Sequence, residues 1–286
     1  MINDKELIIN DFRRLGILKG DFLFITADLL RVGYFNESKS QTEKDWVQIL
    51  FDVVGDEGDV IVACYNKTFF KFKKNNNLIF NKNIESSSGA LSNILLKSNR
   101  CFRSNHPTNS YIGFGKRALN ILKDHDKTKG SYQVVEDILQ FKPKNLMIGT
   151  IDKQNAPMAF HQVQHNLGYN YKHPFCGLKQ IYTIEDGTKK IFTRKDIGGC
   201  SGASHKLLPE VINLSLSTVG LIGRAKTLVI DGAQAHKMFY KILKKKVDLV
   251  KCDDKSCIGC YGRPNNPLFL YTYLLNLPKI ISTLFK

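Results

Sequence analysis

Short apolar runs that alternate with segments of helical periodicity constrain the fold of this chain more than any other feature. Three such runs, at residues 22–26, 60–64 and 146–149, have the length of strands that are buried on both faces. The segments with helical spacing of apolar residues cover 4–15, 42–54, 89–97, 116–125 and 232–244. This alternation predicts a layered α/β/α sandwich around a central mixed sheet.

Local signals mark the ends of several elements. Thr42 is expected to cap the second helix, with Asp45 at its third position. Asp186-Gly187 lies between two short apolar runs and predicts a hairpin. Residues 65–88 are rich in Lys, Asn and Ser, and we interpret them as a long surface excursion.

The basic charge of the chain limits the classes of partner. The formal net charge is +16, and residues 97–130 and 237–286 hold most of the excess. Such charge suits nucleic acid, a membrane surface or a phosphorylated small molecule, and a Lys-rich composition without a specific partner is the alternative. No nucleic-acid-binding motif accompanies it, so a nucleic-acid partner is disfavoured.

The compartment follows from the apolar pattern and the cysteines. No apolar run has the length of a transmembrane segment, and the N-terminus has no secretory pattern. We therefore expect a cytoplasmic protein, in which the 7 cysteines are mostly reduced thiols.

Two polar patches carry candidate chemistry. The loop at 103–117 combines Arg, His, Pro and Gly ahead of a helix, which suits an anionic ligand such as a phosphate. The patch at 160–165 places His161 on a predicted helix, where a neutral imidazole can remove a proton. Gln164 and His165 share its face of that helix. Together the patches indicate a phosphate-bearing cosubstrate and a proton-abstraction step.

Four landmarks occur in a fixed order along the chain. They are a strand and turn at 22–33, a turn and strand at 54–62, Phe102-Arg-Ser-Asn-His-Pro-Thr-Asn-Ser110, and Leu146-Met-Ile-Gly149 leading to His161. In this order they resemble the aminoglycoside 3-N-acetyltransferase family, from about residue 5 to about residue 245. The third landmark is the most specific, because it is close to the family's Arg-Ser-x-His-Pro-x-x-Ser. The resemblance implies acetyl-coenzyme A (acetyl-CoA) as cosubstrate.

The resemblance also implies a set of site residues. The candidates are His161, Gln164 and Asp28 for catalysis, and Arg103, Ser104, His106 and Ser110 for contact with the phosphates of CoA or for shaping of that site. Each group has a plainer alternative. His161 would then be a structural histidine, the 103–110 loop a solvated basic loop, and Asp28 a surface carboxylate.

Departures from the family's pattern bear on the substrate. Gln164 replaces the acidic residue three positions after the family's catalytic His, and Met158 replaces a Thr three positions before it. An amide can orient an imidazole ring but cannot stabilise an imidazolium by charge. The loss of the acid argues against a typical aminoglycoside, and the Asp28 form resembles members associated with bacterial surface-polysaccharide clusters.

The expected function is acetyl-CoA-dependent transfer of an acetyl group to the amino group of an amino sugar. The acceptor would be a nucleotide-linked sugar or a glycan precursor. The alternative is a catalytically altered relative that binds CoA or a protein partner without acetylating an aminoglycoside.

The C-terminal segment lies outside the resemblance. We expect residues 1–246 to form an acetyltransferase-like α/β domain and residues 247–286 to form an extension. Its apolar stretch, 266–285, could pack on the core, pair with a second subunit in a homodimer, or lie on a membrane surface as an amphipathic helix, and packing or dimerisation is favoured. Pro278 is expected to break it as one continuous helix.

The extension contains a fragment of a metal-binding pattern, made of Cys252, Cys257 and Cys260. A closed zinc site would need a fourth ligand, for which the candidates are Cys200, His236 and Cys176. The favoured interpretation is a reduced, unliganded trio, so no residue is assigned to a metal.

Overall fold

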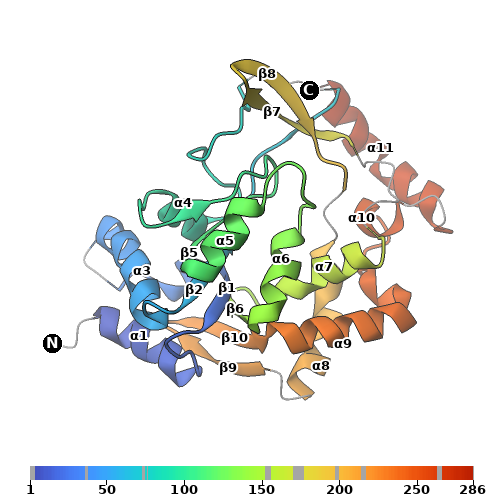
Figure 1. The fold of residues 1–286 in the computed structure, drawn as a ribbon. Helices are drawn as coiled ribbons and strands as arrows, with labels where there is room; N and C mark the ends of the chain where they lie inside the picture. Colours follow the sequence, from blue (N-terminus) through green and yellow to red (C-terminus); the bar gives the residue numbers. More distant parts are fainter. Residues whose placement is uncertain are drawn as a thin grey trace.

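The fold is built on one central sheet (Figure 1). The structure is a computed structural model, and it describes residues 4–35, 38–72, 75, 77–151, 156–169, 177–196, 200–213, 217–262 and 266–285. Within these residues the sheet has seven strands in the order β4-β5-β2-β1-β6-β10-β9. They are β1 (Phe22–Ala27), β2 (Asp59–Ala63), β4 (Phe102–Arg103), β5 (Tyr111–Phe114), β6 (Lys144–Ile148), β9 (Ser217–Ile222) and β10 (Ala225–Asp231). The three predicted strands are therefore confirmed as β1, β2 and β6, which are adjacent at the centre of the sheet.

The sheet is mixed, as the sequence predicts. β1 runs parallel to both of its neighbours, with Ile25 paired to Val62 on one side and to Leu146 on the other. β5 and β10 pair antiparallel with β2 and β6. The chain passes from β1 to β2 on one side and later reaches β6 on the other, so the strand order reverses beside β1. In open α/β sheets, ligands bind at the carboxyl ends of the strands at such a point.

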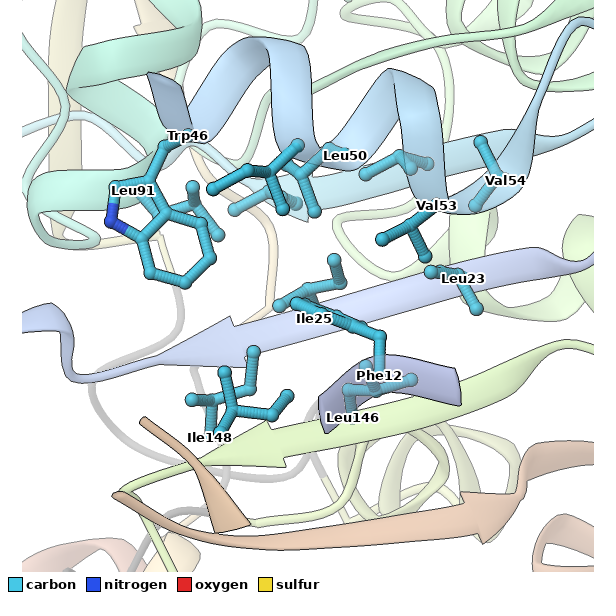
Figure 2. Packing of buried hydrophobic residues seen from close by; sticks show 14 of the residues in the cluster. Phe12, Leu23, Ile25, Trp46, Leu50, Val53, Val54, Leu91, Leu146 and Ile148 are labelled. Atoms are coloured by element: carbon cyan, nitrogen blue, oxygen red, sulfur yellow. The ribbon is translucent and has the colours of Figure 1, made fainter. Parts of the chain in front are cut away.

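Helices cover both faces of the sheet, which confirms the α/β/α sandwich (Figure 1). One face carries α1 (Asp4–Arg14), α3 (Lys39–Val54) and α4 (Ala90–Leu96), and the other carries α5 (Lys116–Asp124), α6 (Gln133–Ile138), α7 (Met158–Asn166) and α9 (Gly232–Lys245). Alternate residues of β1 serve opposite faces, as the pleat requires. Leu23 and Ile25 pack on the α3 side (Figure 2), whereas Phe22 and Phe24 pack on the α5–α9 side.

A smaller antiparallel sheet contains β3 (Phe69–Phe70), β7 (Lys179–Glu185) and β8 (Thr188–Thr193). Asp186 and Gly187 join β7 to β8 with φ angles of 51° and 72°, which confirms the predicted hairpin. The interpretation of 65–88 as a surface excursion is wrong in part. Phe69 pairs with Gln180 and is buried, so this segment adds an edge strand to the small sheet.

Two helix boundaries differ from the prediction. α3 begins before Thr42, because the Ser38 hydroxyl accepts a hydrogen bond from Gln41 N at 3.1 Å and caps the helix there. α11 (Phe269–Phe285) continues through Pro278, which the sequence predicts would break it. The carbonyl group that loses its N–H partner belongs to Leu274, a residue that is 67% exposed.

The C-terminal residues begin by packing on the α/β core. Leu249 of η3 (Val247–Val250) packs against the core on the α5–α9 side, and Lys206 of η2 (Ser201–Lys206) donates to the Lys251 carbonyl oxygen at 2.8 Å. The other short helices are α2 (Leu29–Val32), η1 (Leu139–Phe141), α8 (Leu208–Asn213) and α10 (Ile258–Tyr261). The domain boundary after residue 246 and the homodimer stay predictions. Among the described residues, no helix combines the length and the apolar character needed to cross a bilayer.

Candidate active site

The histidine predicted as the general base lies in α7. The start of this helix is fixed to β6, because Met158 N donates to Asn145 Oδ1 at 2.9 Å. One turn further on, His161 Nδ1 lies 2.8 Å from Gln164 Oε1. An amide oxygen only accepts hydrogen bonds, so this contact places the proton on Nδ1 and leaves the lone pair on Nε2. Gln164 therefore holds His161 in the tautomer that a general base needs.

The surroundings of His161 keep its imidazole neutral. Burial lowers its pKa below the usual value of 6.5, and the Arg194 guanidinium acts in the same direction, whereas the hydrogen bond that the ring donates to Gln164 opposes them. The half-buried ring stacks on Tyr132, with the ring centroids 5.7 Å apart. At neutral pH the ring is therefore able to accept a proton.

Next to Tyr132 lies a buried ion pair that no sequence motif indicates. Arg194 Nε donates to Asp196 Oδ1 at 2.8 Å, and Ser131 Oγ donates to the same oxygen at 2.8 Å. Arg194 Cζ lies 5.9 Å from the centroid of the Tyr132 ring. Within the described residues, the buried Arg194 Nη2 has no hydrogen-bond acceptor. The position of Arg194 and Asp196 directly after a predicted hairpin strand was the signal that could have found them.

A basic cavity adjoins this ion pair. Its volume is about 170 Å³, and Arg194, Asp196 and Ser131 form part of its wall. Its lining also includes the lysines Lys127, Lys129 and Lys195. The excess of cations suits an anionic group.

Asp28 lies at a different cavity, at the carboxyl end of β1. Its Oδ1 accepts a hydrogen bond from Leu30 N at 3.2 Å and caps α2, and its Oδ2 lies 3.6 Å from Arg31 Nε. The cavity that it lines has a volume of about 320 Å³, and His161 is not part of the lining. The structure thus joins Gln164 to His161 and places Asp28 at the edge of the sheet beside β1.

The lining of the Asp28 cavity suits a ligand with apolar and polar parts. Trp46 and Ile94 provide apolar surface, and Lys39 provides a positive charge. Thr42 and Thr150 also line it, and their buried hydroxyl groups have no hydrogen-bond partner in the described part of the chain.

Arg103 is buried and its hydrogen bonds are internal. Its Nε donates to Ser110 Oγ at 2.9 Å, and its terminal nitrogens donate to the carbonyl oxygens of Lys82, Ile84 and Cys64 and to Asn66 Oδ1, at 3.2, 2.6, 2.9 and 2.6 Å. A guanidinium has five N–H donors, and all five are used. Of the two roles expected for Arg103, the geometry therefore supports shaping of the loop rather than contact with a phosphate.

Ser104 and His106 are likewise held inside the protein. Ser104 Oγ accepts from Tyr111 N at 2.9 Å and lies 3.1 Å from His125 Nδ1. His106 Nδ1 accepts from Asn109 N at 3.0 Å, and its ring stacks on His125 with the centroids 4.9 Å apart. Burial lowers the pKa of His106 to about 3 and that of His125 to about 4. Most of the 103–110 loop is thus a buried scaffold, and His106 also forms part of the wall of the basic cavity.

The mixed sheet with helices on both faces defines the chain as a three-layered α/β protein. The sequence profile of aminoglycoside 3-N-acetyltransferases matches residues 24–244, and the chain belongs to this family. It is therefore an acetyl-CoA-dependent N-acetyltransferase. No curated protein sequence matches it significantly.

Solved structures of the family share the fold. The apoenzyme of aminoglycoside acetyltransferase AAC(3)-IVa superposes with a TM-score of 0.71 at 15% identity, over 90% of this chain and 93% of that chain. AAC-IIIb in a binary complex with CoASH superposes with a TM-score of 0.68 at 18% identity, over 85% of this chain and 96% of that chain. AAC-VIa bound to sisomicin superposes with a TM-score of 0.67 at 17% identity, over 85% of this chain and 97% of that chain.

Proposed function

We propose that this enzyme transfers the acetyl group of acetyl-CoA to the amino group of a nucleotide-linked sugar or glycan precursor, with His161 as general base. The observation that carries the proposal is the 2.8 Å contact between His161 Nδ1 and Gln164 Oε1, which directs a neutral Nε2 lone pair away from Gln164.

The proposed chemistry needs no protein nucleophile. His161 Nε2 takes a proton from the acceptor's ammonium group, which frees the amine to attack the thioester carbonyl carbon. A C–N bond forms and the C–S bond breaks. The nitrogen of the tetrahedral intermediate then loses a second proton to water, and the imidazolium gives its proton to the departing sulfur. The ammonium group and the thioester thus become an amide, a free thiol and one released proton. Gln164 keeps Nδ1 protonated throughout and orients the ring.

The cavity beside Asp28 fits part of the cosubstrate. It lies where the strand order reverses, and Trp46 and Ile94 offer apolar contact for a flexible arm. Thr42 and Thr150 add polar groups to the lining, and Lys39 is available for a phosphate. We place acetyl-CoA there, in a cytoplasmic protein whose thiols are kept reduced.

The charge near His161 favours an anionic acceptor over a polycationic one. Arg194 and the lysines of the basic cavity would repel an aminoglycoside that carries several ammonium groups. They would attract the diphosphate of a nucleotide-linked amino sugar. The replacement of the family's acid by Gln164 acts in the same direction, because it removes a negative charge from the site.

A panel assay tests the proposal. Acetyl-CoA is incubated with the enzyme and with UDP-linked amino sugars, free amino sugars or sisomicin, and free thiol is measured together with the mass of the product. We expect thiol release with a UDP-linked amino sugar and a product that resists hydroxylamine, as an amide does. An aminoglycoside as the best acceptor would contradict the charge argument. Binding of CoA by calorimetry without turnover on any acceptor would favour the catalytically altered relative.

A further inference from the structure

Four cysteines from two distant parts of the chain meet beside η2. Cys252, Cys257 and Cys260 belong to the C-terminal extension, and Cys200 directly precedes η2. Their Sγ atoms all lie within 4.8 Å of one another, and none of the four residues forms a disulfide in this structure. The fourth ligand that the sequence pattern lacked is therefore supplied by the fold.

The spacing of the four sulfurs matches a single tetrahedral ion. Zn–S bonds of about 2.3 Å place the sulfurs of a tetrahedron about 3.8 Å apart. An iron–sulfur cluster would hold them farther apart, because several iron and sulfide atoms lie between the thiolates. We propose that Cys200, Cys252, Cys257 and Cys260 bind one Zn²⁺ ion in a closed structural site.

The surroundings of the sulfurs suit thiolate ligands. Gly202 N donates to Cys200 Sγ at 3.3 Å, and Cys252 N donates to Cys260 Sγ at 3.3 Å. Such N–H groups stabilise the negative charge of bound thiolates and orient them. Four thiolates around Zn²⁺ leave a net charge of about −2, and the lysines Lys206, Lys251 and Lys255 lie on the segments that carry the cluster.

The site is also shielded and mechanically supported. Cys252 and Cys260 are buried, and Tyr261 packs against them. The Tyr261 hydroxyl donates to the Cys252 carbonyl oxygen at 2.6 Å, and Lys255 Nζ donates to the Tyr261 hydroxyl at 3.1 Å. Four protein ligands in a shielded cluster leave no open position for a substrate, so the ion is structural rather than catalytic.

The ion would fasten the extension to the candidate active site. Cys200 follows Arg194 and Asp196 closely in the sequence, and those two residues line the basic cavity. Zinc would thus limit the motion of the segment that shapes the acceptor site, a consequence that rests on the proposed function. The zinc assignment itself rests only on the four sulfurs.

Metal analysis of the full chain tests the assignment. The protein is unfolded with a chelator, refolded with Zn²⁺ under reducing conditions and desalted, and its metal content is measured by mass spectrometry. We expect one zinc per chain. Cys257→Ser should lower the zinc affinity by at least about 100-fold, more than the loss of an outer-shell partner does. Cys101→Ser, a thiol outside the cluster, is the matched control and should keep its zinc.

Cobalt provides a readout that does not depend on a folded variant. Titration of the metal-free wild-type chain with Co²⁺ should give one equivalent with thiolate-to-cobalt charge-transfer absorption and the strong d–d bands of a tetrahedral site. Four thiols that react freely after zinc addition would overturn the proposal, as would a disulfide within the cluster or iron in place of zinc.

Discussion

Gln164 is the residue at which the site departs most clearly from the pattern of its family. It orients the imidazole ring as a carboxylate would, because its oxygen accepts a hydrogen bond from Nδ1 of His161. It does not supply charge to stabilise an imidazolium. The lowered pKa of His161 follows from this combination of burial with a neutral partner and the nearby Arg194 cation.

Restoring the acid should change the pH dependence of catalysis. In the wild type, activity should fall only below pH 6.5, because burial lowers the pKa of His161 and the base is lost when it is protonated. Gln164→Glu should raise that pKa and move the acid limb of kcat/KM upward by about one unit, with activity at neutral pH preserved or raised. Gln164→Met, whose thioether is only a weak acceptor, should lose activity without that upward shift. An acid limb that stays in place in Gln164→Glu would separate Gln164 from His161.

Arg103 should act on stability rather than on binding of CoA. Arg103→Lys keeps the charge but cannot reach the five acceptors, so we expect the free energy of unfolding to fall by at least about 3 kcal/mol. Denaturant unfolding measures this, with Arg100→Lys at an exposed position as the control. A stable variant with weakened CoA binding in calorimetry would return Arg103 to the phosphate-binding role.

At the scale of elements, the central strands could be predicted from the sequence because burial on both faces makes them continuous apolar runs. The role of the 103–110 loop could not. Arg103 in a polar, basic segment resembles a solvated side chain, and its acceptors are carbonyl groups that only the fold brings to it. For the same reason, the sequence left Cys200 as one of three candidates for the fourth metal ligand. Distance along the chain does not show which residues the fold brings together.

The buried histidines His106 and His125 should make the fold sensitive to acid. Both histidines have pKa values below that of an unfolded chain, at about 3 and about 4, so the unfolded state binds more protons. The contribution of the two neutral histidines to the free energy of unfolding is therefore fully present above about pH 6.5. It falls as the pH is lowered towards their pKa values in the folded protein. For each of the two histidines, the free energy of unfolding should be lower by about 2 kcal/mol at pH 5 than at pH 7.5.

Urea unfolding at the two pH values measures this effect. His125→Phe keeps a ring in the stack but removes one titrating group, so the loss between pH 7.5 and pH 5 should shrink by about 2 kcal/mol. The exposed His205 is the control, and His205→Asn should leave the loss unchanged. Equal losses in the wild type and His125→Phe would show that the pair does not set the acid response.

For the whole molecule, the charge distribution should select the acceptor. The net charge of +16 and the cations of the basic cavity attract anions over a range that salt shortens. Arg194→Gln should therefore raise KM for a UDP-linked amino sugar by about 10-fold or more, and the wild-type KM should rise with ionic strength. Lys123→Gln, on α5 and outside the cavity lining, is the control. A KM independent of both salt and Arg194 would move the acceptor site elsewhere.

The most direct test of the central claim is the turnover of His161→Ala, measured as thiol release at saturating acetyl-CoA and acceptor. General-base catalysis by this imidazole predicts a kcat lower by about 100-fold or more, with the fold intact by circular dichroism. His236→Gln, on the neighbouring α9, should keep wild-type turnover. A kcat for His161→Ala within about threefold of the wild type would contradict the account, because a contribution of that size is far below that of a general base.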